Sequence, residues 1–117
     1  MQDVDYKKIG SRIRDLRIKH KYTQEQLGEM IGCSNNHISH IETGTNKVSL
    51  TLLLRLSHAF EISLDYFLLD TPFARPEAIV DFEISKKLSA CSASTLVTVN
   101  HMLDMLLEQQ KNMEPKA

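Results

Sequence analysis

The chain has 117 residues, of which 42% are hydrophobic and 25% charged, with 14 Lys and Arg residues against 15 Asp and Glu residues. This composition is typical of one soluble domain, or of one domain with an appendage, and leaves little room for a two-lobed enzyme. Because twenty consecutive apolar residues occur nowhere, we expect no membrane span.

The charges are distributed unevenly along the chain. Residues 6–47 carry eight basic and four acidic groups, whereas residues 70–117 carry five basic and seven acidic groups. This asymmetry predicts a basic working face in the first half of the chain and a neutral or acidic partner region in the second half.

The first residues indicate the compartment. They are polar and acidic, and they lack the basic start and apolar run of a secretory signal. We therefore expect a cytoplasmic protein. Cys33 and Cys91 match no metal or redox spacing, and a reducing compartment would keep both as thiols.

Residues 6–69 predict five short helices, because apolar residues recur there at intervals of three and four. The first helix covers about residues 6–20. Each later helix follows a hydroxyl residue that can cap its N-terminus, namely Thr23, Ser34, Ser49 or Ser63. Thr23 and Gln26 also form a capping-box pattern. Gly32 and Gly44 are expected to end the second and third helices.

Residues 70–76 predict a linker, because Pro72 and Pro76 cannot both lie inside one helix. A short helix is expected over residues 77–91 and a longer one over about residues 93–111. The longer helix carries an apolar stripe formed by Leu96, Val99, Leu103, Leu106 and Leu107. The predicted organisation is all-α, with a domain at 1–69, the linker at 70–76 and a helical C-terminal segment at 77–117.

Residues 24–44 carry the pattern that points to a function. Two helices joined by a short turn can cross closely only if their contact points are small or apolar. Gly28 lies where the helices would approach, Gly32 makes the turn, and the residues spaced to seal the interior are Leu27, Ile31, Cys33, Ile38 and Ile41. This run resembles the helix-turn-helix of the phage-repressor and Cro class, the XRE family, and the resemblance extends over residues 6–69. It implies a five-helix repressor-like domain that binds specific sequences of double-stranded DNA and regulates transcription.

The predicted third helix is the one that would enter the major groove and present its N-terminal residues to base edges. With Ile38 and Ile41 facing inward, the helical period turns the other side chains outward. Asparagine suits a bidentate pair with adenine. The candidate base-reading residues are Asn35, Asn36, Ser39, His40 and Thr43, of which His40 occupies a third reading position by the resemblance.

The resemblance also implies contacts with the DNA backbone. Gln24 begins the first helix of the motif, where the family contacts a phosphate, and a helix N-terminus favours an anion. Asn46 and Lys47 match phosphate-contacting positions on the other side of the motif. His37 lies at the flank, where a phosphate contact and simple exposure remain open. Arg17 and Glu42 resemble the internal ion pair of the family, a structural contact.

Metal binding and catalysis receive little support. Cys33, His37 and His40 have a spacing that invites a metal-site interpretation. Since Cys33 must face the core while His40 faces outward, we expect no metal there and no cofactor. The sequence has no phosphate-binding loop, dinucleotide fingerprint or nucleophile elbow, so we expect no enzyme.

The apolar stripe of the C-terminal segment is expected to pack against another protein surface. It could fold back on the N-terminal domain or pair with the same helix of a second subunit. We favour the second arrangement, in which the protein is a homodimer. We expect this homodimer to repress transcription at a two-fold operator and therefore to be found at the nucleoid. The alternative is a protein-interaction module, such as an antitoxin or anti-regulator, that binds its target through the C-terminal helix.

Overall fold

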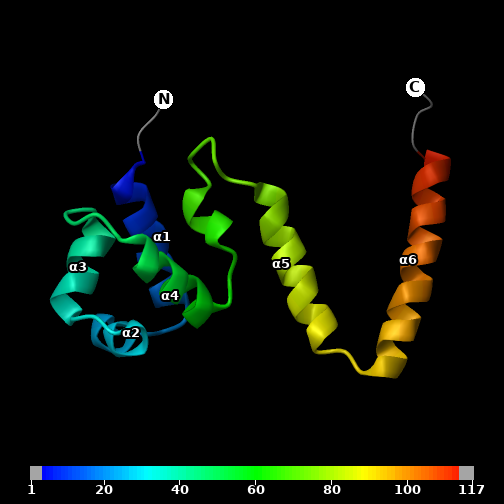
Figure 1. Ribbon diagram of the computed structural model, residues 1–117, viewed down its shortest axis with the longest axis horizontal. Coiled ribbons are helices and arrows are strands. Elements are labelled where there is room, and N and C mark those ends of the chain that lie inside the picture. The colour runs from blue at the N-terminus through cyan, green and yellow to red at the C-terminus, as the bar shows by residue number, and fades with distance from the viewer. Residues whose placement is uncertain (1–3, 114–117) are drawn as a thin grey trace. The chain divides into compact units, whose positions relative to one another are not determined.

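The computed structural model describes residues 4–113, and these residues form helices and no strand. In chain order the elements are α1 (Tyr6–Lys19), α2 (Gln24–Ile31), α3 (Asn35–Thr43), α4 (Leu50–Phe60), the 3₁₀ helix η1 (Leu64–Leu68), α5 (Pro76–Ser89) and α6 (Ala93–Met113) (Figure 1). The predicted all-α fold class is confirmed. The fifth of the expected helices is the 3₁₀ helix η1, a single short element.

Capping by side chains fixes where these helices begin. The hydroxyl groups of the four expected cap residues each accept a backbone N–H from the first turn of their helix, as predicted for Thr23, Ser34, Ser49 and Ser63. The capping box is complete, because Thr23 Oγ1 accepts from Gln26 N at 3.0 Å and Gln26 Oε1 accepts from Thr23 N at 2.8 Å. Local sequence therefore determines where these four helices begin.

Two glycines fix where α2 and α3 end. Gly32 and Gly44 both have φ of +77°, in the left-handed region where a side chain would be strained. Both positions were predicted as helix ends from the sequence. The short turn between α2 and α3 follows from the first of them.

The hydrophobic core lies between α1, α2, α3, α4 and η1. α1 packs on α3 and η1, and α2 packs on α3 and α4. The buried apolar side chains are Ile9, Ile13, Leu16, Leu27, Ile31, Ile38, Ile41, Val48, Leu52, Leu53, Leu56, Phe60 and Phe67. Their burial supplies the main driving force for folding this domain.

The chain divides into two compact units, of which the first ends at Phe82 and the second begins at Glu83. This boundary lies inside α5, whereas the sequence predicted a linker at residues 70–76. Residues 70–75 form a turn held to the first unit, in which Asp65 Oδ1 accepts from Arg75 N at 2.8 Å and Asp70 pairs with Arg12. Pro76 then begins α5, a position where proline needs no N–H.

The two C-terminal helices have no core of their own. Among the residues that the structure describes, neither α5 nor α6 contains a buried residue. None of the described helices is both long enough and apolar enough to cross a membrane.

Candidate nucleic-acid interface

The turn between α2 and α3 holds these helices close together. Gly28 O accepts from both Gly32 N at 2.8 Å and Cys33 N at 2.9 Å, which folds the chain tightly at the end of α2. A Cβ atom on Gly28 would overlap the carbonyl oxygen of Cys33. Position 28 therefore requires glycine, as the spacing in the sequence predicts.

α3 has one buried face and one exposed face. Ile38 and Ile41 are 0% and 1% exposed and anchor the helix in the core. Ser34 Oγ accepts from His37 N at 3.1 Å and caps its first turn. The structure brings the five candidate base-reading residues to the opposite side, where Asn35, Asn36, His40 and Thr43 are exposed and Ser39 is half-buried.

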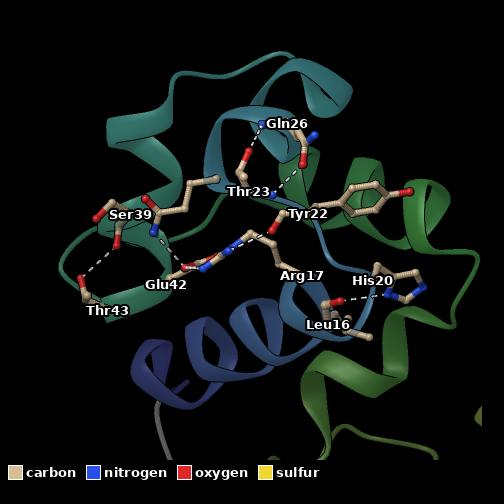
Figure 2. A network of polar contacts seen from close by, with 10 residues as sticks. Leu16, Arg17, His20, Tyr22, Thr23, Gln26, Ser39, Glu42 and Thr43 are labelled. Carbon is tan, nitrogen blue, oxygen red and sulfur yellow. Dashed lines mark hydrogen bonds and ion pairs between the residues drawn. The ribbon is translucent and has the colours of Figure 1, made fainter.

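This outward face is polar and carries hydrogen-bonding groups. Some of these groups are already bonded within the protein, whereas others are exposed. The Thr43 hydroxyl bonds to the carbonyl oxygen of Ser39 at 3.3 Å (Figure 2). It also bonds to the carbonyl oxygen of His40 at 3.2 Å and to Thr45 Oγ1 at 2.8 Å. Its donor is therefore used inside the helix and the following loop. The amide groups of Asn35 and Asn36 remain exposed at the N-terminal end, where a major-groove helix meets base edges.

The four candidate phosphate residues lie on α2, on α3 and in the loop after α3. Asn46 and Lys47 are exposed, whereas Gln24 and His37 are half-buried. Gln24 Nε2 donates to Glu42 Oε1 at 3.1 Å, so one of its amide hydrogens is used within the protein.

The loop after α3 is hydrogen-bonded to the outward face of α3. Asn46 N donates to His40 O at 3.2 Å, and Asn46 Nδ2 lies 3.5 Å from His40 Nδ1. A candidate phosphate residue and a candidate base-reading residue are therefore in contact.

An ion pair fixes α3 against α1. Arg17 donates from Nε and Nη2 to the two oxygens of Glu42, and from Nη1 to Tyr22 O at 3.0 Å. Figure 2 shows the two charged side chains meeting between the helices. The hydrogen bond to Glu42 raises the pKa of Arg17, so the guanidinium stays charged. The ion pair that the resemblance implied is thus present, and it sets the position of α3.

The residues Cys33, His37 and His40 do not form a metal-binding group. Cys33 packs against the core while His40 is exposed, and burial raises the pKa of the Cys33 thiol. No cluster of three or more His, Cys, Asp or Glu residues suited to a metal ion occurs within residues 4–113.

The candidate dimerisation residues all lie on α6. Leu103, Leu106 and Leu107 are 48%, 56% and 58% exposed, Leu96 is also exposed, and Val99 is half-buried. Within the second unit these side chains leave an uncovered apolar stripe.

Sequence reasoning missed two residues that shape this interface, Gly10 and Tyr6. Gly10 on α1 lies directly beneath the carbonyl groups of Ile41 and Glu42 at the end of α3. Tyr6 lies beneath Lys47, whose Nζ is 5.8 Å from the ring centroid. A glycine within an amphipathic helix was a signal for the first of these contacts, whereas the pattern of the sequence offers none for the second.

Known proteins match the part of the chain that carries this geometry. A family model described as helix-turn-helix matches residues 13–67. The restriction-modification controller protein C.AhdI from Aeromonas hydrophila is 32% identical, and the match covers 54% of this chain and 96% of that one with a TM-score of 0.52. The chain belongs to the XRE-type helix-turn-helix family. In this helix-turn-helix, α2 is the first helix of the motif and α3 is the recognition helix.

The curated relatives include a transcriptional regulator and an antitoxin. An uncharacterized HTH-type transcriptional regulator of Sinorhizobium medicae is 36% identical over 64 residues, which are 55% of this chain and 46% of the relative. Antitoxin PezA of Streptococcus pneumoniae is 30% identical over 80 residues, which are 68% of this chain and 49% of the relative. The chain thus spans about half the length of these two relatives.

Proposed function

We propose that the chain is a sequence-specific transcriptional regulator that binds double-stranded DNA and acts as a repressor on a two-fold operator as a homodimer. The observation that carries this proposal is the outward face of α3, which is polar and carries no Asp, Glu, Lys or Arg, while the opposite face is buried in the core. Such a face can both donate and accept hydrogen bonds at base edges. DNA binding would place the protein at the nucleoid in the cytoplasm.

Asn35 and Asn36 are the main base readers in this proposal. Both are exposed at the start of the recognition helix, and each amide can pair with the N6 and N7 edge of adenine. His40 and Ser39 read neighbouring positions. Thr43 contributes its methyl group or an accepting lone pair, because its hydroxyl proton is used within the helix.

Backbone contacts would set the register of α3 in the groove. Lys47 would supply a charge to one phosphate, with the amide of Asn46 beside it, and His37 would contact the backbone at the flank of α3. Gln24 would donate its second amide hydrogen to a phosphate while Glu42 holds the first. These contacts would position the recognition helix without selecting a sequence.

The homodimer is supported by the exposure of the apolar stripe on α6. A two-fold site contacted by two recognition helices gives far tighter and more selective binding than one helix can. Two half-sites about 34–36 Å apart are expected for such a dimer.

The alternative function is that of a protein-interaction module, such as an antitoxin or anti-regulator. The match to an antitoxin and the uncovered stripe on α6 favour it. In that case the target would be a protein bound through α6.

A selection from a randomised DNA library with purified protein tests the proposal. The wild-type chain should enrich a palindromic sequence, and the Asn35→Ala/Asn36→Ala variant should lose it. Asn36→Ala alone should cost about 1–3 kcal/mol at one base pair per half-site, whereas Lys47→Ala should weaken binding to all sequences alike. Asn112→Ala, which removes an exposed asparagine from α6 outside the apolar stripe, is the matched control and should enrich the wild-type sequence.

The outcomes separate the two functions. A folded wild-type protein that enriches no DNA would refute DNA reading and favour the protein partner. An equal loss on every sequence for Asn36→Ala would refute its role in base reading. A reporter gene placed behind the selected operator then measures repression, and an increase in expression would contradict the repressor role.

A further inference from the structure

The loop at residues 44–48, which joins α3 to α4, lies directly on the first turn of α1. A Cβ atom on Gly44 would lie 2.8 Å from Lys7 Cα and 2.9 Å from Lys7 N, so the two backbones meet without a side chain between them. This contact brings Lys47 and Tyr6 together, and Lys47 Nζ lies 5.8 Å from the centre of the Tyr6 ring. A cation within about 6 Å of an aromatic ring is attracted to its face.

Both partners of this contact have fixed backbones. The loop is anchored on either side of Lys47, because Asn46 N donates to His40 O at 3.2 Å and Val48 is buried. The Tyr6 ring is half-buried and packs against the core. The side chain of Lys47 is then a long mobile group on a fixed backbone.

The N-terminus of α1 does not itself offer a phosphate site. Asp5 Oδ1 accepts from Lys7 N at 3.0 Å and from Lys8 N at 3.2 Å, so a carboxylate already occupies these backbone donors. The first turn of α1 can therefore assist phosphate binding through the ring of Tyr6 rather than through its own N–H groups.

We propose that Tyr6 is a positioning residue for the DNA-backbone contact of Lys47. This inference rests on the proposed function, in which Lys47 binds a phosphate. A lysine side chain loses rotamer freedom when it binds a ligand. The ring of Tyr6 restricts that freedom before DNA arrives, so the ammonium group is held at the end of the recognition helix. The first turn of α1 becomes part of the DNA-binding surface.

A double-mutant cycle on the selected operator tests this inference. Tyr6→Leu should weaken DNA binding roughly 2- to 5-fold, which corresponds to the usual strength of an exposed cation–ring contact. In a Lys47→Gln background the same substitution should have no effect. Tyr6→Phe keeps the aromatic face and should bind DNA like the wild type. Tyr66→Leu is the matched control, since that half-buried ring contacts Phe67 instead, and it should leave DNA binding unchanged.

The salt dependence of DNA binding gives a second readout that a purely structural role of Tyr6 would not change. Lys47→Gln should lower the slope of log affinity against log salt concentration by about 1. Tyr6→Leu should lower it by a fraction of that amount. An unchanged slope in Tyr6→Leu would contradict a role through Lys47.

Three further results would overturn the positioning role. The first is an equal loss of affinity from Tyr6→Leu with and without Lys47. The second is a loss in Tyr6→Phe as large as that in Tyr6→Leu, which would assign a direct DNA contact to the hydroxyl group. The third is the absence of a ring-current shift at the Lys47 side-chain protons in the NMR spectrum of the free wild-type protein, a measurement that requires no variant to fold. A wild-type protein that binds no DNA would instead refute the proposed function.

Discussion

Arg17 on α1 donates to Glu42 on α3 from Nε at 2.6 Å and from Nη2 at 3.0 Å, so a two-pronged ion pair joins residues 25 positions apart. The side chains are 13% and 2% exposed, respectively. Two charges that are this deeply buried depend on each other, because either one alone would be left without compensation in a low-dielectric environment.

Loss of Glu42 should therefore destabilise the domain strongly. Glu42→Ala should lower the free energy of unfolding by about 3–5 kcal/mol, because Arg17 keeps its charge without its partner. Urea denaturation followed by circular dichroism measures this change. Asp15→Ala, which removes an exposed carboxylate from α1, should change it by no more than about 0.5 kcal/mol.

Removal of both charges separates the cost of an unpaired charge from the cost of lost side-chain volume. The Arg17→Met/Glu42→Leu variant should recover most of the stability that Glu42→Ala loses, because no unpaired charge remains. A double variant as unstable as Glu42→Ala would contradict the explanation by an uncompensated charge.

Gly10→Ala should destabilise the protein, although alanine is the better helix former. In an ordinary helix interior this change stabilises by roughly 0.5–1 kcal/mol. Here the new Cβ would lie 2.7 Å from Glu42 O and would overlap Ile41 O, so α1 and α3 must move apart. We expect a loss of about 1–3 kcal/mol in thermal melting. Ser11→Ala, at an exposed position of the same helix, is the control, and stabilisation by Gly10→Ala would refute the close packing.

Cys33 should make the free energy of unfolding depend on pH under alkaline conditions. Burial is the larger effect and raises the pKa of its thiol, while the charge of Arg55 opposes this shift. A raised pKa means that the unfolded chain loses its proton first, so this contribution to stability is present below the unfolded pKa and is lost as the pH rises. Relative to Cys33→Ala, the wild type should lose stability above about pH 8.5. Parallel curves of unfolding free energy against pH for the two proteins would contradict this expectation.

The backbone amides of α6 should become more protected from hydrogen exchange as the protein concentration rises. If a second copy covers the apolar stripe, backbone hydrogen exchange in α6 should slow as the concentration rises through the dissociation constant, while exchange in the core helices changes little. Leu103→Asp should abolish this dependence. Met105→Asp changes an exposed residue of the same helix outside the stripe and should retain it. Exchange that is independent of concentration in the wild type would argue against self-association through α6.

The sequence predicted those features that depend on neighbouring residues. The caps at Thr23 and Ser34 and the left-handed ends at Gly32 and Gly44 follow from local chemistry, and all are present. The buried and exposed faces of α3 follow from its period. These features are enough to define the helix-turn-helix and to predict that its candidate base-reading residues lie on the outward face of α3.

Other contacts depend on how elements distant in sequence come together. Tyr6 meets Lys47, and Arg12 meets Asp70, because the ends of α1 pack at particular points on later segments. Periodicity determines which face of a helix is buried but not which side chains meet across the contact. The Arg17–Glu42 pair was anticipated through the resemblance rather than through spacing. The unit boundary at Phe82 lies beyond the proline-rich turn because that turn is bonded to the first unit.

The division of α3 into a locked face and an open face separates two properties that evolution can change independently. The buried side chains of Ile38, Ile41 and Glu42 stabilise the fold of the domain. Asn35 and Asn36 are exposed and lie outside the core. If the proposed function holds, substitution on the open face would redirect the chain to a different target while its unfolding free energy stays nearly constant. A gene copy that diverges at a few such positions would acquire a new target without passing through an unstable intermediate.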